Sequence, residues 1–317
     1  MRFAVDPWDP TYGSALDAEL GASTAEVDAD VEVPAARWAP VAPDPGMAPP
    51  AAVLFVDGVR RVDAQLWIDE PEGAVPALCA SYAAGVVRCG ADGAHLIAAR
   101  VRRGLVTTAD GAVDLVTGAG TYRRVRAAAR PDTPPMQLLS LALQRDLADV
   151  ELLAAAEARD EVPEGDDLLV VDGPLRGRQH LARTVGVIKS HRSDYLPPAL
   201  GGVVATLGAG ERTPVFRLGS SWERFTWYLR LPCRPSHAWA GIVRVEASAE
   251  LSRDAVAALA TRSQVTLPRY ASAEYKDARA PQNLYPVAGL ERELRRRLGH
   301  AERLYRALRR AAVTSPV

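Results

Sequence analysis

Residues 53–58 (Val-Leu-Phe-Val-Asp-Gly) and 168–173 (Leu-Leu-Val-Val-Asp-Gly) are two apolar runs that end in the same Asp-Gly pair. Apolar runs rich in valine and bounded by Asp-Gly predict buried strands, and each of these strands would end in a carboxylate. If the two strands are neighbours in one sheet, Asp57 and Asp172 emerge at the same edge. Two carboxylates at one point are suited to holding a divalent metal ion.

The sequence between the two runs predicts how they are connected. Strand-like segments lie at 53–57, 61–68, 78–88, 95–103 and, more weakly, 121–126. Their short connections predict antiparallel neighbours. Leucines at helical spacing then predict a long helix over 136–159, before the strand that ends at Asp172. A crossing helix allows this strand to lie parallel to the first. The predicted fold class is α/β, an RNase H-like mixed sheet flanked by helices, with an irregular N-terminal arm.

The sequence after residue 173 predicts further elements of both kinds. They are a helix or turn at 176–192, strands at 214–218, 225–231 and 240–247, a helix at 251–262 that Ser252 begins, and a last helix at 286–311.

Charge divides the chain at about residue 50. Residues 1–50 hold nine acidic residues and two arginines, a balance of −7, so the net charge of −1 leaves about +6 for residues 51–317. We therefore predict an acidic, Pro/Ala-rich arm over 1–50 and one domain over 51–317. A mildly basic body is compatible with nucleic-acid binding.

Several classes of protein lack their sequence signals here. The three cysteines show no disulfide or zinc spacing, which favours a cytoplasmic setting. No signal peptide and no 18-residue apolar span is present, so no membrane association is expected. The phosphate loop of P-loop ATPases, the Gly-x-Ser-x-Gly elbow and the His-Glu-x2-His motif are also missing.

A two-metal nuclease needs three or four converging carboxylates, and the helices offer the remainder. On the long helix, Glu151 is favoured because small and apolar residues surround it, and a carboxylate there is costly without a partner. Glu157 is the alternative. The last helix offers Glu291 and Glu293. The simpler readings stay open: an Asp-Gly pair is often a turn, and these glutamates fit solvated or ion-paired positions on a helix.

Basic residues near these acids suggest phosphate contacts. Lys189 is one of only two lysines in a chain that otherwise uses arginine, and it would orient water or hold the scissile phosphate. Arg60 and Arg61 follow the first Asp-Gly pair, and Arg292 and Arg296 belong to a strongly basic last helix. The alternatives are an ordinary surface lysine and a solvated helix face. His191, beside Lys189, is interpreted as a loop residue rather than a phosphate contact.

Residues 51–300 resemble the NurA nuclease family. The similar segments, in order, are 54–58, 169–175, Gly-Val-Ile-Lys-Ser at 186–190, Trp-Tyr-Leu-Arg at 227–230, and Asn-Leu-Tyr-Pro at 283–286 before a final helix.

The resemblance implies an RNase H-like, metal-dependent DNA nuclease of the endo- or 5′–3′ exonuclease type, active in DNA end processing and repair. It implies Mn²⁺ or Mg²⁺ as cofactor, a homodimer, and a HerA-type hexameric ATPase as partner. By the same resemblance, Asp57, Glu151 and Asp172 are metal ligands, and Tyr275 is the nearest match to a C-terminal tyrosine.

One position departs from the family pattern. Where the final helix usually carries His or Asp, this chain has Glu293, with Glu291 as a neighbour of equal chemistry. Glutamate still ligates metal, but its longer arm changes the geometry. A second hypothesis is therefore a catalytically weakened scaffold that binds DNA ends or a HerA-type ATPase.

Overall fold

The chain forms two compact units. The computed structural model describes residues 25–130, 132–161, 165–190, 195–220, 222–234, 236–273, 275–277 and 279–314. The first unit comprises Met1–Phe55, Arg88–Ala94 and Glu164–Ala288, and the second comprises Val56–Val87, His95–Pro163 and Gly289–Val317. The predicted division at residue 50 falls inside the first unit and stays a prediction.

The described residues form a mixed α/β structure with a large sheet. The strands are β1 (Glu26–Asp28), β2 (Ala52–Glu70), β3 (Gly73–Gly90), β4 (Gly93–Thr107), β5 (Leu115–Thr117), β6 (Gly120–Arg126), β7 (Asp167–Asp172), β8 (Thr184–Ile188), β9 (Phe216–Gly219), β10 (Glu223–Arg230) and β11 (Ile242–Ser248). The α-helices are α1 (Pro135–Glu161), α2 (Pro198–Thr206), α3 (Arg253–Thr266), α4 (Tyr285–Arg297) and α5 (Ala301–Thr314), and the 3₁₀ helices are η1 (Ala35–Arg37) and η2 (Leu267–Tyr270).

Across these described elements, hydrogen-bonded strands follow the order β1-β9-β10-β11-β8-β7-β2-β3-β4-β6-β5. The pairing is mixed, since β7 runs parallel to β8 and β8 runs antiparallel to β11. None of the helices in the described part of the chain combines the length and apolar character that a bilayer crossing requires.

The two Asp-Gly strands are neighbours, as predicted, because β7 and β2 are adjacent in the sheet. Ala51 donates its N–H to Asp166 Oδ2 at 2.9 Å, and Ala52 donates to the Asp166 carbonyl at 3.2 Å, so the two strands begin side by side. Asp57 is the sixth residue of β2 and Asp172 is the sixth of β7. Because each residue of a strand advances it by about 3.3 Å, equal positions reach equal heights.

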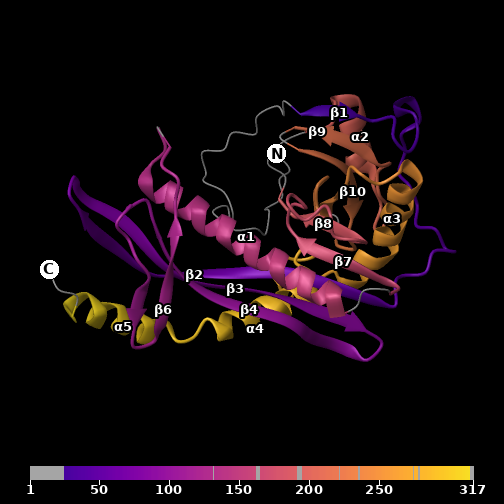
Figure 1. Ribbon diagram of the computed structural model, residues 1–317. Helices are drawn as coiled ribbons and strands as arrows, with labels where there is room; N and C mark the ends of the chain where they lie inside the picture. The colour runs from indigo at the N-terminus through magenta and orange to yellow at the C-terminus, as the bar shows by residue number, and fades with distance from the viewer. Residues whose placement is uncertain are drawn as a thin grey trace. The chain divides into compact units, whose positions relative to one another are not determined.

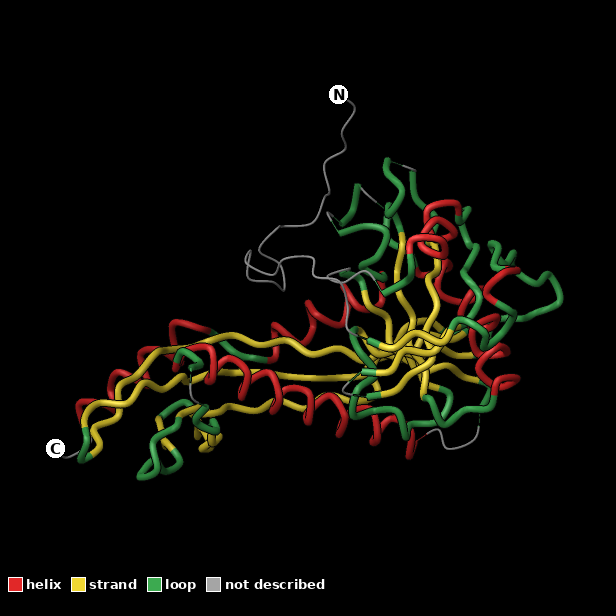
Figure 2. Tube along the Cα trace, turned by 90° about the horizontal axis from the view of Figure 1, so that it is seen from above, coloured by secondary structure: helices red, strands yellow, loops and turns green. Residues whose placement is uncertain are grey.

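The second unit consists of long strands with helices along them (Figures 1 and 2). Two-residue turns join β2 to β3 and β3 to β4, a connection that only antiparallel neighbours allow. The predicted long helix is α1. Its buried positions recur at intervals of three or four residues, so one face of the helix packs inward. These positions are Leu139, Leu143, Leu147, Val150, Ala154 and Ala158.

Two predictions for this unit are wrong. The segments 53–57 and 61–68 are one continuous strand, β2, and Gly58 lies inside it rather than at its end. The single last helix is two helices, α4 and α5. Gly299, with φ of 83°, separates them, because this left-handed conformation suits glycine and ends a helix.

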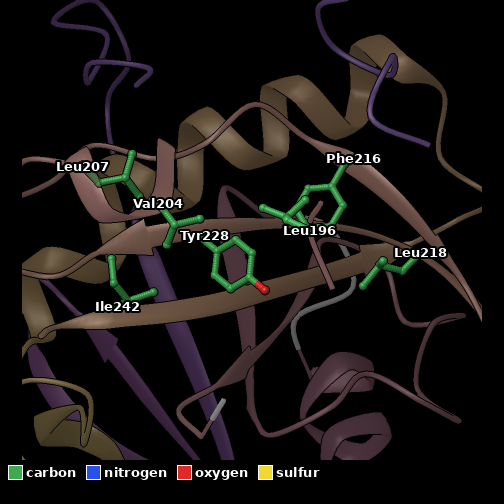
Figure 3. Packing of buried hydrophobic residues seen from close by; sticks show 7 residues of the cluster. All are labelled: Leu196, Val204, Leu207, Phe216, Leu218, Tyr228 and Ile242. Carbon is green, nitrogen blue, oxygen red and sulfur yellow. The ribbon is translucent and has the colours of Figure 1, made fainter. Parts of the chain in front are cut away.

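The first unit carries the remaining strands, with α2 and α3 beside them (Figure 1). The segment 176–192 was predicted to be a helix or turn. Turns occupy residues 176–183, but residues 184–188 form strand β8, so the prediction is wrong for that part. Ser252 begins α3 as predicted, because its Oγ accepts the Ala255 N–H at 3.2 Å. Figure 3 shows the buried cluster of this unit, which includes Phe216 and Tyr228.

Part of the acidic arm belongs to the packed structure of this unit. Arg212 is fully buried and makes two 2.8 Å hydrogen bonds to the Glu32 carboxylate, which also accepts the Val215 N–H at 2.7 Å. Burial acts to raise the pKa of Glu32, but the hydrogen bonds and charge of Arg212 outweigh it, and the pKa is lowered. Trp38 packs against Phe216. Residues 1–24 lie outside the described residues.

Candidate metal centre

The glycine inside β2 brings a helix carboxylate close to Asp57. Asp57 is 8% exposed. A Cβ on Gly58 would clash with Oε1 of Glu151 and would lie 2.9 Å from Cδ1 of Leu147. A larger residue at position 58 would force these two side chains to shift, so glycine leaves room for the Glu151 carboxylate of α1 against the strand, one residue after Asp57. The Asp-Gly pair in this strand serves close packing and not a turn.

A second helix supplies another carboxylate. Glu291 belongs to the second turn of α4, its side chain is 13% exposed, and Arg295 Nη2 lies 3.8 Å from its Oε2. Asp57, Asp172 and Glu291 each present one carboxylate oxygen, and these oxygens all lie within 4.8 Å of one another. Three negative groups this close repel each other unless cations compensate them.

Asp172 begins a chain of polar contacts in the first unit. Lys189 Nζ donates to Asp172 Oδ2 at 2.6 Å and to Asn283 Oδ1 at 3.1 Å. The Asn283 amide in turn donates to Asp277 Oδ2 at 2.6 Å. The Lys189 side chain is 9% exposed, so burial and two acceptors fix its ammonium group. Lys189 neutralises one of the clustered carboxylates.

The loop after Asp172 crosses over β8 and is held by a residue of β11, the next strand of the sheet. A Cβ on Gly186 would lie 2.7 Å from the Gly173 carbonyl oxygen and 2.9 Å from the Leu175 nitrogen, so the loop crosses directly over this glycine. Gly173 has φ of 124°, which lets the chain leave β7 sharply. The Leu175 N–H donates to Glu246 Oε2 at 3.1 Å. Glu246 therefore positions the loop that follows Asp172.

Glu246 is itself part of a buried charged cluster. It is 1% exposed, and its Oε1 lies 2.8 Å from Arg224 Nε and 2.7 Å from Arg244 Nη1. The Arg224 guanidinium lies over the Trp222 ring at 4.9 Å and that of Arg244 over the Tyr195 ring at 4.8 Å. The Glu246 carboxylate is the acidic partner in both ion pairs, so the two arginines share its single negative charge.

The predicted ligands are thus partly brought together. Asp57 and Asp172 share the cluster, Lys189 contacts Asp172, and Glu151 lies against Gly58 without belonging to the group of three. Glu293 lies apart from that group and makes ion pairs with Arg296 at 3.1 Å and Arg297 at 2.9 Å. The hydrogen bond from Arg297 lowers the pKa of Glu293, and the charge of Arg296 adds to this.

The other predicted residues are not gathered at the carboxylates. Tyr275 is 82% exposed and its ring faces Lys276. Arg61 donates to Asp63 and to the Gly299 carbonyl, both at 2.8 Å, which are contacts within the fold. The remaining predicted phosphate contacts, Arg60, Arg292 and Arg296, are exposed at the surface. His191 lies outside the described residues.

Sequence reasoning missed Asn283, Asp277 and Glu246 as residues of this site. A signal existed for Glu246, because it and Arg244 are the charged residues in the otherwise apolar run 242–247. Charged residues in such a run require burial with partners. Asn283 stood in a segment already singled out, but its link to Lys189 spans 94 positions of sequence.

No protein-family model and no curated protein matches this sequence. Among solved structures, the chain is similar to the NurA nuclease from Sulfolobus solfataricus, with 11% identity, a TM-score of 0.42, and coverage of 82% of this chain and 84% of that one. It is also similar to an endonuclease V from Bacillus subtilis, with 14% identity, a TM-score of 0.35, and coverage of 77% and 79%. Both similarities are weak, so function must be inferred from the residues of the site.

Proposed function

We propose that this protein is a divalent-metal-dependent nuclease that hydrolyses phosphodiester bonds in DNA. The supporting observation is the group of three carboxylate oxygens, from Asp57, Asp172 and Glu291, within 4.8 Å of one another. Carboxylate oxygens are the ligands that Mg²⁺ and Mn²⁺ prefer. Oxygens bound to one Mg²⁺ ion lie at most about 4.2 Å apart, so these three carboxylates would draw closer together on binding it.

In this proposal each residue has a separate task. Asp57, Asp172 and Glu291 bind the metal, and Glu151, held against Gly58, is the candidate for completing a second metal position. A bound divalent ion would activate water and neutralise charge on the phosphate. Lys189, oriented by Asn283, donates a hydrogen bond to a phosphate oxygen. Water adds to phosphorus, the bond to the leaving sugar oxygen breaks, and a proton passes to that oxygen.

The proposal extends to the finer features that the sequence resemblance implies. They are an RNase H-like fold of the NurA family, Mn²⁺ as the working metal, a homodimer, and a HerA-type ATPase partner in cytoplasmic DNA end processing. Glu291 takes the ligand position first given to Glu293, because Glu291 is the glutamate of α4 that lies with the aspartates.

Cleavage of labelled DNA tests the proposed function. The purified chain is mixed with single-stranded DNA labelled at one end. Separate reactions contain Mn²⁺, Mg²⁺ or EDTA, with each metal at a millimolar concentration. We expect shortened products with either metal and none with EDTA. Denaturing gels resolve the products. Intact DNA under all metal conditions would contradict the proposal, provided that circular dichroism shows a folded protein.

The second hypothesis, a weakened scaffold, draws on one contact. The Lys189 ammonium group lies 2.6 Å from Asp172 Oδ2, where it competes with a metal ion for that oxygen. A fixed cation at this position would suit a structural carboxylate cluster that binds DNA ends or an ATPase without cleaving DNA.

Replacing Lys189 by methionine separates the two hypotheses. Removing the ammonium group takes a competing positive charge from Asp172, so we expect Lys189→Met to bind Mn²⁺ about tenfold more tightly, about 1.4 kcal/mol. If the wild type is an active nuclease, the same change lowers cleavage because the phosphate loses its donor. Titration of Mn²⁺, followed by the electron paramagnetic resonance signal of the free ion, measures the affinity.

Lys276→Met is the matched control, since Lys276 is the other lysine and lies over the rings of Tyr275 and Tyr285. We expect it to bind Mn²⁺ as the wild type does. Equal Mn²⁺ affinity in all three proteins would show that Lys189 does not compete for the metal. A wild type that binds no Mn²⁺, beside a Lys189→Met variant that does, would favour the scaffold.

A further inference from the structure

A basic groove lies in the second unit, along helix α5. It has a volume of about 780 Å³, and its walls are α5 and the turn between β5 and β6. The turn contributes Thr117, Gly118 and Ala119. A Cβ on Gly118 would meet no atom within 4 Å, so this side of the groove is open.

Three arginines of α5 give the groove its charge. Arg303, Arg306 and Arg310 line it, and the residues found around it in the described part of the chain include no Asp or Glu. Arg306 lies 4.0 Å from Glu302, but both side chains are at least 70% exposed, so this pair is weak. Within the described residues, Arg303 and Arg310 take part in no ion pair. The groove therefore presents three positive charges, of which only that of Arg306 has a partner among the described residues, in a weak and exposed pair.

The three arginines form a stripe that the fold holds in place. Positions 303, 306 and 310 lie on one face of a helix, and about 10 Å separates the first from the last along its axis. Leu304 and Leu308 of the same helix are 3% exposed. Leu308 packs with Tyr122 and Leu105, so the apolar face of α5 is occupied.

This arrangement selects among anionic partners. An amphipathic helix binds a membrane by inserting its apolar face, and that face of α5 is buried. One strand of a duplex carries a phosphate about every 3.4 Å along the axis, and an extended single strand spaces them more widely, so a stripe of about 10 Å spans two or three phosphates. Because the site is a concave groove with backbone on one wall, it accommodates an extended chain better than a flat binding surface would.

We propose that this groove binds the phosphodiester backbone of a nucleic-acid strand, apart from the residues that would bind metal. The inference builds on the proposed nuclease function by naming a second contact with the same substrate. Small residues on both walls leave room for sugar and phosphate, and the guanidinium groups pair with phosphate oxygens. Such contacts carry no base specificity and weaken steeply with salt.

The test measures binding without cleavage. A fluorescent 20-nucleotide single strand is titrated in EDTA at several salt concentrations, and anisotropy is recorded. The groove variant carries three changes: Arg303→Gln, Arg306→Gln and Arg310→Gln. The charge-matched control changes three exposed arginines elsewhere that make no ion pair among the described residues: Arg37→Gln, Arg130→Gln and Arg145→Gln.

We expect the groove variant to bind at least about tenfold more weakly at low salt, and the control to bind as the wild type does. The slope of log affinity against log salt should fall by about two, since each single-strand phosphate contact contributes about 0.7. Equal binding by groove variant and control would overturn the proposal. Groove-dependent binding of phosphatidylglycerol vesicles or polyglutamate, as tight as that of DNA, would overturn the choice of partner.

Hydrolysis of thymidine 5′-(4-nitrophenyl phosphate) distinguishes failure of the groove from failure of the nuclease. This substrate is too short to reach both sites, so the groove variant should hydrolyse it at the wild-type rate. If the chain hydrolyses it but the groove variant binds DNA normally, only the groove proposal fails. If no substrate is hydrolysed while binding still depends on the groove, only the nuclease proposal fails.

Discussion

Asp57→Asn and Asp172→Asn are each expected to lower the rate of Mn²⁺-dependent DNA cleavage by about 10³-fold or more. Each change keeps the size of the side chain and removes one of three charges that lie within 4.8 Å of one another. A 10³-fold lower rate corresponds to a loss of about 4 kcal/mol of transition-state stabilisation. A bound metal ion contributes several kcal/mol of this kind, so the loss is of the expected size. Single-turnover cleavage of end-labelled DNA, with protein in excess, measures the chemical step.

The two glutamates of α4 make this test sharper. Glu291→Gln should lower cleavage as the aspartate changes do. Glu293→Gln is its matched control, two residues away, and should lower cleavage less than threefold because Glu293 pairs with Arg296 and Arg297. Full activity in Glu291→Gln, or a loss confined to Glu293→Gln, would restore the original assignment. Cleavage that survives both aspartate changes would reject the metal site.

Stabilisation by metal gives a readout that does not depend on activity. A ligand that binds only the folded state raises the melting temperature, by an amount set by its concentration relative to its dissociation constant. Mn²⁺ should therefore raise the melting temperature of the wild type and of Glu293→Gln. The same addition should have little effect on Asp57→Asn or Glu291→Gln.

The meeting of Asp57 and Asp172 was predictable because it needs only local patterns and topology. Two apolar runs of equal form, separated by a crossing helix, become neighbours, and each aspartate holds the sixth position of its strand. The role of Gly58 was not predictable. The sequence suggested a turn, but the partner of this glycine is Glu151, 93 residues later, and no local pattern identifies it.

The spacing of apolar residues along α4 could have distinguished Glu291 from Glu293 as the metal ligand. Val287, Leu290 and Leu294 are buried and, with Leu298 just after the end of the helix, mark the inner face of α4. At 100° per residue, Glu291 lies about 55° from the centre of that face and Glu293 about 105°. Family resemblance pointed to Glu293 by counting along the sequence, while helix geometry favours Glu291.

The wrong element boundaries also have local causes. The run Thr-Val-Gly-Val-Ile at 184–188 is β8, although the sequence predicted a helix or turn there, and this short strand has a glycine at its centre. That glycine is required because the chain after Asp172 crosses over it. Glycine commonly ends a helix, and Gly299 does so here. The prediction of one helix over 286–311 did not take this glycine into account.

Glu246→Gln is expected to lower the free energy of unfolding by about 3–5 kcal/mol and the melting temperature by about 10 °C. The substitution keeps the shape of the side chain but removes the negative charge that Arg224 and Arg244 share, and both guanidinium groups are nearly buried. Breaking a buried ion pair leaves an uncompensated charge in a medium that solvates it poorly. Thermal and urea unfolding, followed by circular dichroism, measure the change.

Glu223→Gln is the matched control, because Glu223 also pairs with an arginine, Arg217, but both side chains are largely exposed. Exposed pairs contribute at most about 1 kcal/mol, so its melting temperature should stay within about 3 °C of the wild type. Equal stability of Glu246→Gln and Glu223→Gln would show that the two buried arginines do not depend on the Glu246 charge.

A triple variant separates the charge of this cluster from its role in holding the metal centre. In Arg224→Met, Arg244→Met and Glu246→Leu together, apolar side chains of similar size replace all three charges, a change that often restores stability. The Leu175 N–H still loses its acceptor, and the loop after Asp172 loses its tether to β11. The triple variant should therefore regain most of the melting temperature but bind Mn²⁺ several-fold more weakly than the wild type. If stability and Mn²⁺ affinity recover together, Glu246 contributes charge balance only, and the position of Asp172 is set by β7 and Lys189.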